Sequence, residues 1–229
     1  MTLCDLTCAE WTALLATYSV RVITAPAFAD EPITIEDAWH HLRIDTFPNE
    51  DSPPVTVSGD DYWLENIGIP AARNWAEGYV GKSLSTQTLE LVGTSFPSTY
   101  FELPFGPVQS VESIVYVDAD DVEQTMSSAD YVLNSDTWPA RVQLAYGVEA
   151  WPTSRGTYND VRVRYVTGYT PPNDSPAGFV ITPTLKIGIL LMLGHLYENR
   201  ETTITASLTE IPLGARAFLD KDRVRRGWA

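Results

Sequence analysis

Basic side chains and a tryptophan are concentrated in the last fourteen residues of an otherwise acidic chain. Residues 216–229 hold five basic and two acidic residues; the whole chain carries −15, which leaves −18 for the other residues. Guanidinium groups form forked hydrogen bonds with carboxylates, and tryptophan is an effective anchor at protein interfaces. The pattern indicates a segment that docks into another protein; the alternative is a basic end that only aids solubility. The predicted docking tail consists of Asp222, Arg223, Val224, Arg225, Arg226, Gly227, Trp228 and Ala229.

A cluster of carboxylates in the middle of the chain could bind calcium or act in hydrolysis. Asp118, Asp120, Asp121 and Glu123 have the spacing that opens a calcium-binding loop. However, the glycine needed at the sixth position and the glutamate needed at the twelfth are both missing. We therefore predict a β-turn with solvated acids and keep a carboxylate-dependent hydrolase only as an alternative hypothesis.

Histidines give little support for a metal site. His195 and Glu198 are three apart and would share a helix face, but no second histidine lies near them in the sequence. His40 and His41 are adjacent, so on a helix their side chains would point about 100° apart.

The chain has no nucleophile elbow, phosphate loop, dinucleotide-binding motif or zinc-type cysteine spacing. We predict that the protein is not an enzyme and has no catalytic residues, metal or cofactor.

Charge and cysteine content narrow the possible partners. A net charge of −15 argues against wrapping nucleic acid, because phosphates attract basic surfaces. Cys4 and Cys8 do not form a disulfide framework, and the N-terminus lacks the basic region of a signal peptide. The longest apolar stretch, residues 187–193, is far shorter than the ~20 residues of a membrane span. We expect a cytosolic protein without a membrane segment.

Helical periodicity of apolar residues appears at both ends of the chain. Pro70 stands inside one helical segment and removes a backbone donor, so a kink or break is expected there. Gly188 and Gly194 lie in the most apolar segment and should allow neighbouring helices to approach closely. The predicted helices cover residues 7–18, 34–43, about 58–80, 183–200 and 215–225.

Between residues 85 and about 169 the period changes from helical to alternating. In the last of these segments Val161, Val163 and Tyr165 would face one side of a sheet, and Arg162 and Arg164 the other. β-branched and aromatic residues dominate, and Gly, Pro, Asp and Asn separate the runs. The predicted strands are residues 86–92, 100–103, 111–117, 131–133, 141–146 and 161–166.

These patterns predict an α+β fold. Helices from both ends should form one helical bundle, because neither set has enough apolar surface alone. The bundle would carry an inserted antiparallel β domain and an extended C-terminal tail. The predicted parts are an N-terminal extension with a short helix (1–30), the first bundle helices (31–84), the β domain (85–180), the C-terminal bundle helices (181–221) and the docking tail (222–229).

Four residues of the β region are candidates for further contacts. Arg162 and Arg164 mark a wet sheet face or a subunit or tail-side contact, and Trp138 and Trp151 flank turns beside prolines. Exposed tryptophans are also typical of glycan binding. A non-catalytic glycan- or protein-binding β module is therefore the alternative to an assembly part.

Six ordered segments resemble the head–tail connector (adaptor, head-completion) proteins of long-tailed phages, prophages and gene transfer agents. The likeness covers about residues 31–226, whereas residues 1–30, Pro70 and the long loop 47–59 depart from the usual pattern. The segments are ITIEDAWHHLRID (33–45), ARNWAEGYVG (72–81), LPFGPVQSV (103–111), VRVRYVTGY (161–169), LMLGHLYENR (191–200) and RVRR (223–226).

The resemblance implies a structural ring, expected to be twelve-fold, in the virion neck. Such a ring binds the portal protein at the capsid vertex, extends the DNA channel and presents a surface to a stopper or tail-completion protein. DNA would pass without sequence-specific binding. The subunits would be made in the host bacterial cytoplasm, and residues 222–229 would insert into the portal.

Overall fold

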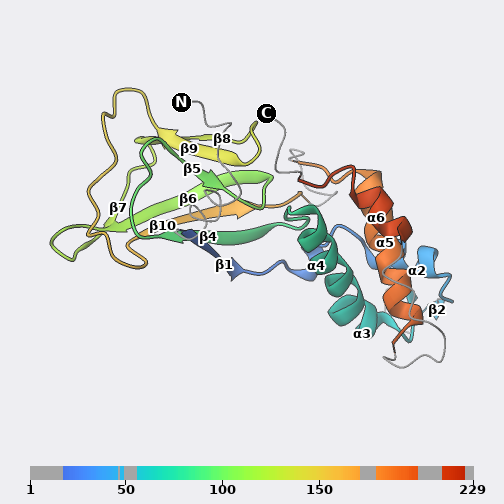
Figure 1. Ribbon diagram of the computed structural model, residues 1–229. Helices are drawn as coiled ribbons and strands as arrows, with labels where there is room; N and C mark the ends of the chain where they lie inside the picture. The colour runs from blue at the N-terminus through green and yellow to red at the C-terminus, as the bar shows by residue number, and fades with distance from the viewer. Residues whose placement is uncertain (1–17, 46, 49–55, 171–178, 201–212, 225–229) are drawn as a thin grey trace. The chain divides into compact units, whose positions relative to one another are not determined.

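The structure is a computed structural model that describes residues 18–45, 47–48, 56–170, 179–200 and 213–224 (Figure 1). The chain divides into two compact units. Of the described residues, those within 18–25 and 86–168 form a β unit, and those within 26–85 and 169–224 form a helical unit. Among the described residues, no helix combines the length and apolar character needed to cross a bilayer.

The β unit contains two antiparallel sheets. One has the order β1-β4-β10-β6-β7 and the other the order β5-β9-β8. Side chains of both sheets, including Phe101, Val142 and Tyr165, form one buried apolar cluster. The strands are β1 (Tyr18–Thr24), β4 (Gln87–Gly93), β5 (Tyr100–Leu103), β6 (Val108–Val117), β7 (Glu123–Thr125), β8 (Tyr131–Asn134), β9 (Ala140–Leu144) and β10 (Val161–Thr167).

Strand β10 lies in the interior of the larger sheet, where it pairs with β4 and β6. Val161, Val163 and Tyr165 are buried, whereas Arg162 and Arg164 are partly exposed on the opposite face. The alternation predicted for this strand is confirmed. It arises because successive side chains of an extended chain point to opposite faces of the sheet.

Strand β1 corrects one sequence prediction. The helical spacing predicts a helix that ends at Tyr18, but Tyr18 begins a strand that pairs antiparallel with β4. Its spacing fits a helical stripe, yet the residues after it are β-branched at alternate positions and find a partner strand. The remainder of the predicted first helix lies outside the described residues. Strand β7 was not predicted, since its three exposed residues carry no apolar alternation.

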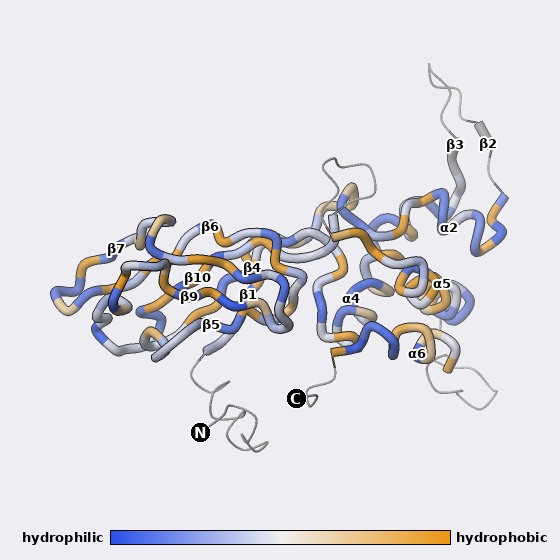
Figure 2. Tube along the Cα trace, turned by 90° about the horizontal axis from the view of Figure 1, so that it is seen from above, coloured by the Kyte–Doolittle hydropathy of each residue, from blue (hydrophilic) through white to orange (hydrophobic). Residues whose placement is uncertain are grey.

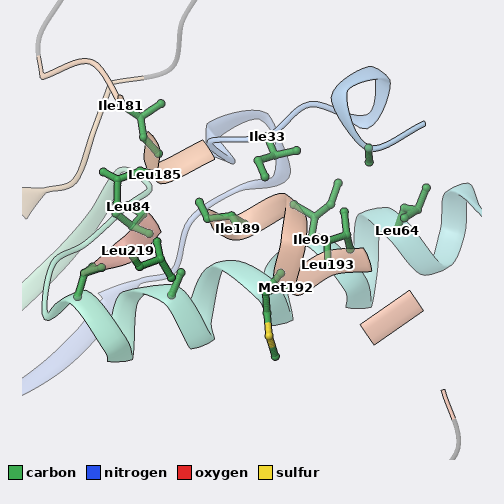
Figure 3. Close-up of a cluster of buried hydrophobic side chains, with 14 of the residues drawn as sticks. Ile33, Leu64, Ile69, Leu84, Ile181, Leu185, Ile189, Met192, Leu193 and Leu219 are labelled. Carbon is green, nitrogen blue, oxygen red and sulfur yellow. The ribbon is translucent and has the colours of Figure 1, made fainter. Parts of the chain in front are cut away.

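The helical unit is built around α5 (Pro183–Glu198), which contacts helices that precede and follow it in the chain (Figures 2 and 3). The Thr182 hydroxyl accepts a hydrogen bond from Leu185 N, and Pro183 occupies the first turn, where its missing N–H costs no helical bond. Thr34 caps α2 in a reciprocal capping box with Asp37. The other elements are η2 (Phe28–Asp30), α2 (Ile35–Leu42), β2 (Phe47–Pro48), β3 (Thr56–Val57), α3 (Asp61–Trp63), η3 (Leu64–Gly68), α4 (Ile69–Val80) and α6 (Leu213–Leu219).

The interruption predicted at Pro70 is present, but the helix widens rather than breaks. The turn before α4 is a π-helical turn, η3, in which Ile69 N donates to Leu64 O, five residues back. Pro70 cannot donate to the carbonyl four residues earlier, and the wider turn accommodates that missing bond. The Trp63 ring covers Gly68 so closely that a Cβ at position 68 would clash with Cζ3 of the ring.

Gly188 sets the distance between α5 and α6. A Cβ at Gly188 would lie 2.7 Å from Cδ2 of Leu219, which is fully buried. We predict that Gly188→Ala lowers the free energy of unfolding by about 1–3 kcal/mol in urea titrations, despite the better helix propensity of alanine. Gly194→Ala is the matched control, because its Cβ would meet the His41 ring at 3.6 Å, an ordinary contact. Equal stability of the two variants would contradict the prediction.

Candidate functional site

The first described residues of the predicted docking tail, Asp222, Arg223 and Val224, are held against the helical unit. They follow α6 and lie beside the end of α4, where Gly81 adopts a left-handed conformation (φ 73°) that favours glycine. Arg225, Arg226, Gly227, Trp228 and Ala229 lie outside the described residues. We call the contact region the tail root; it consists of Tyr79, Lys82, Asp220, Asp222, Arg223 and Val224.

A backbone bond fixes the last described residue. Val224 N donates to Val80 O at 2.8 Å. The Val224 side chain lies beside Gly81, within 3.6 Å of the position that a Cβ would take there. The described start of the tail is therefore held at the C-terminal end of α4.

Side chains of α4 add a stacked anchor. Trp75 and Tyr79 stack with their ring centroids 5.5 Å apart, and the Arg223 guanidinium lies 4.8 Å from the Tyr79 centroid. The Tyr79 hydroxyl donates to Asp220 at 2.8 Å. This bond to a carboxylate is the main reason that the pKa of Tyr79 is raised. The aromatic pair thus contacts both the end of α6 and the first basic residue of the tail.

Asp222 connects the tail root to the start of α5. Its carboxylate lies 3.9 Å from Lys82 Nζ and 3.5 Å from the Thr182 hydroxyl. Thr182 is also the N-cap of α5, so the same hydroxyl contacts both the first turn of α5 and Asp222 of the tail root. Burial, and secondly the Asp222 charge, raise the pKa of Tyr169. The root is therefore supported by the end of one helix and the beginning of another.

The candidate arginines of the β unit are paired within the chain. Arg164 Nη2 lies 3.0 Å from Glu90, which Arg21 also contacts, and Arg162 pairs with Glu123. Burial would raise the pKa of Glu90, but the hydrogen bonds from Arg21 and Arg164 outweigh it and the pKa is lowered. Subunit or tail-side contacts of Arg162 and Arg164 stay a prediction.

The two candidate tryptophans have different surroundings. Trp151 stacks on Phe96 with centroids 5.3 Å apart and meets Phe101 edge-on, so its ring is part of an aromatic cluster. An open cavity of about 460 Å³ lies beside it, lined among others by Phe96 and Glu149. Trp138 is 39% exposed and covers Gly106. Contacts of either tryptophan with another molecule stay a prediction.

The acidic candidates form turns. The Asp118 carboxylate accepts hydrogen bonds from Asp120 N and Val122 N, both at 3.0 Å, as expected for a β-turn. His195 contacts Asn199. Within the described ranges, no group of three or more His, Cys, Asp or Glu side chains could hold a metal ion.

Sequence reasoning missed the partners of the tail root. Tyr79 and Asp220 are 141 residues apart, and the segment 72–81 that contains Tyr79 gives no sign of its distant partner. The only local signal was the spacing of Trp75 and Tyr79, four residues apart on one helix.

Comparisons with known proteins identify the fold. No protein-family profile and no curated protein sequence match the chain. Several solved structures match the chain. One is a chain in the neck of an empty gene transfer agent (GTA) particle, determined with C6 symmetry. It has a TM-score of 0.68 and 21% sequence identity, and the match covers 91% of this chain and 96% of that chain. A chain in the virion of a native GTA particle has a TM-score of 0.66 and 21% identity, covering 90% and 96%.

A third match is a chain in the neck of a native GTA particle determined with C12 symmetry, with a TM-score of 0.64, 20% identity and coverage of 91% and 96%. The protein therefore has the α+β fold of a GTA neck chain over nearly its whole length. The resemblance drawn from the six sequence segments is confirmed in this respect.

Proposed function

We propose that the protein is a structural neck component of a phage-like particle, an adaptor ring that joins the portal to the stopper or tail. The observation that carries this proposal is the shared fold with GTA neck chains over 91% of this chain and 96% of theirs. The C12 symmetry of one matching neck supports a ring of twelve copies. In this proposal the protein acts by binding other proteins and catalyses no reaction.

The tail supplies the contact to the portal. Trp228 would bury about 200 Å², which corresponds to at most ~5 kcal/mol before ordering costs. A single tail is a modest anchor, but tails of one ring that engage together gain avidity. The tail root supports this role because it holds Val224, the last described residue before the anchor, in one place.

The acidic composition suits a DNA channel. A ring of chains that each carry −15 would have a strongly negative surface. Such a surface repels the DNA backbone within about one Debye length, ~8 Å at physiological salt. DNA would then slide through the ring without adhering to it.

Truncation tests the proposed docking. A chain that ends at Val224 keeps the tail root and should unfold at the same temperature as the full chain, but should lose portal binding at least 100-fold in pull-down titrations. Trp228→Ala should reproduce most of the loss. Unchanged portal binding by the truncated chain would disprove the docking role of the tail.

A further inference from the structure

The open cavity beside Trp151 has an aromatic wall and a polar rim. Its volume is about 460 Å³, and the β4–β5 and β9–β10 connections supply most of its lining. Phe96 and Trp151 stack with ring centroids 5.3 Å apart, both rings meet Phe101 edge-on, and both residues are only partly buried. The polar residues of the lining are Ser95, Ser98, Glu149, Thr153 and Ser154. The cavity therefore combines apolar rings with a mouth that opens to solvent.

The first described residue of the chain, Tyr18, lies at this cavity. Its hydroxyl donates to the carbonyl oxygen of Ser95, a lining residue, at 2.8 Å. The Tyr18 ring meets Phe101 edge-on with centroids 5.9 Å apart, and Phe101 meets Trp151 at 5.3 Å. The segment that precedes Tyr18 is therefore attached two ring contacts away from the aromatic wall.

Chain connectivity selects residues 1–17 as the occupant of the cavity. They lead directly into β1, so their point of attachment belongs to the β unit. The other segments outside the described residues are attached to described residues of the helical unit. These other segments are residues 46, 49–55, 171–178, 201–212 and 225–229. Residues 1–17 are thus the one such segment whose attachment is fixed beside the cavity.

The composition of residues 1–17 suits an apolar cavity. Eleven of these 17 residues are hydrophobic, a larger share than the 44% of the whole chain. In a helix, Cys8, Trp11 and Leu15 would fall on one face and Ala13 on the opposite face. Trp11 precedes Tyr18 by seven residues, about 10 Å along a helix, which is within the span of the two ring contacts. The apolar face is therefore long enough to reach the cavity.

We propose that residues 7–17 form an amphipathic helix that packs back onto the β unit of the same chain and places Trp11 in the cavity. The Trp11 ring would contact Phe96 and Trp151, and aromatic rings attract one another beyond the area that they bury. The docked helix would cover Trp151, which would remove this ring from any glycan-binding surface. The proposal goes beyond the neck function and does not depend on it.

Cross-linking of the native Cys8 measures whether the segment is docked. The chain has two cysteines, so Cys8 is the only native thiol in a Cys4→Ser background. One further cysteine is placed at an exposed lining position of the full-length chain, and a short bismaleimide joins thiols that lie close together. The variants, made one at a time, are Ser98→Cys, Glu149→Cys and Thr153→Cys. At least one should become cross-linked within the chain in most molecules.

A distant position gives the first control for cross-linking. Asp136 is exposed and lies before the start of β9, whereas the cavity-lining Leu144 lies at the end of β9. Asp136→Cys should give about one tenth of the cross-link yield of the best cavity position, or less, because the strand between them is about 15 Å long. Equal yields at Asp136 and at the cavity positions would overturn the proposal.

Variants of the segment itself separate docking from mere proximity. An undocked segment attached at Tyr18 would also meet the cavity, but its cross-linking would not depend on Trp11. Trp11→Asp should lower the yield about tenfold or more, because a carboxylate is not buried against aromatic rings without a partner. Ala13→Asp puts the same charge on the opposite face and should leave the yield unchanged. Equal yields for these two variants would refute docking, and a covalent dimer in place of the cross-link within one chain would refute docking within the same chain.

Discussion

Replacing Arg73 with methionine is expected to lower the free energy of unfolding by about 3–5 kcal/mol. The Arg73 side chain is 6% exposed and donates to both Glu31 oxygens, at 3.0 and 2.9 Å, and to Glu77 at 3.0 Å. Methionine fills the space but leaves the 2% exposed Glu31 carboxylate without its cation. Glu77 keeps its bond from Leu84 N, so the main cost comes from Glu31.

The pH dependence of the stability loss in Arg73→Met shows whether the unpaired Glu31 carboxylate causes it. Burial raises the pKa of Glu31 despite Arg73, and removing Arg73 would raise it further. A carboxyl group whose pKa is higher in the folded than in the unfolded state favours folding when it is protonated. The contribution of Glu31 to the free energy of unfolding is therefore fully present below about pH 4.3 and is lost as the pH rises through the folded pKa. The loss in Arg73→Met should therefore be smaller at pH 5 than at pH 7.5 in urea titrations.

Two controls test whether the stability loss in Arg73→Met comes from the buried Glu31 charge or from the loss of any cation. Lys186→Met removes a cation from the more exposed pair with Asp37 and should cost less than about 1 kcal/mol. Adding Glu31→Gln to Arg73→Met should recover part of the stability, because no uncompensated buried charge remains at position 31. A loss that does not change with pH, or that equals the loss in Lys186→Met, would refute this account.

Elements with a complete local signal could be predicted from the sequence. The α5 helix has a threonine cap, a proline in its first turn and an apolar run, all within neighbouring residues. The β10 strand has strict alternation of apolar residues and arginines. In both, the residues that decide the structure are adjacent in the chain, so no tertiary information is needed.

Elements that depend on distant partners could not be predicted. β1 is a strand because it pairs with β4, and its Arg21 contacts Glu90, 69 residues away. The local spacing up to Tyr18 instead suggested a helix. The π turn before Pro70 is a similar case, because the sequence indicates a disturbed helix but not how the backbone accommodates it.

The candidate site was predictable by composition only. The basic residues and Trp228 mark the tail in the sequence. The tail root, by contrast, joins Tyr79 to Asp220 and Val80 to Val224 across more than 140 residues. The sequence therefore indicated which segment should bind a partner, whereas the structure shows how the start of that segment is held.

Replacing Asp160 with alanine is expected to lower the free energy of unfolding by about 2–4 kcal/mol. The Asp160 side chain is 1% exposed, and it accepts hydrogen bonds from Arg155 at 2.8 Å and from the backbone and hydroxyl of Thr157. These bonds fold the long connection between β9 and β10, which Arg155 N also ties to Val117 O. Alanine would leave the Thr157 N–H and the Arg155 guanidinium without this buried acceptor.

Asp121→Ala is the matched control, because Asp121 pairs with the same arginine but is 73% exposed, and its loss should cost less than about 1 kcal/mol.

Burial would raise the pKa of Asp160, but the hydrogen bonds from Arg155 and Thr157 outweigh it and the pKa is lowered. A carboxylate with a depressed folded pKa stabilises the fold above its unfolded pKa, about 3.9, and this contribution is lost as the pH falls through the folded value. The difference between wild type and Asp160→Ala in urea titrations should therefore be constant near neutral pH and shrink below about pH 4. Similar losses for the two aspartates would mean that the buried hydrogen bonds do not hold this connection.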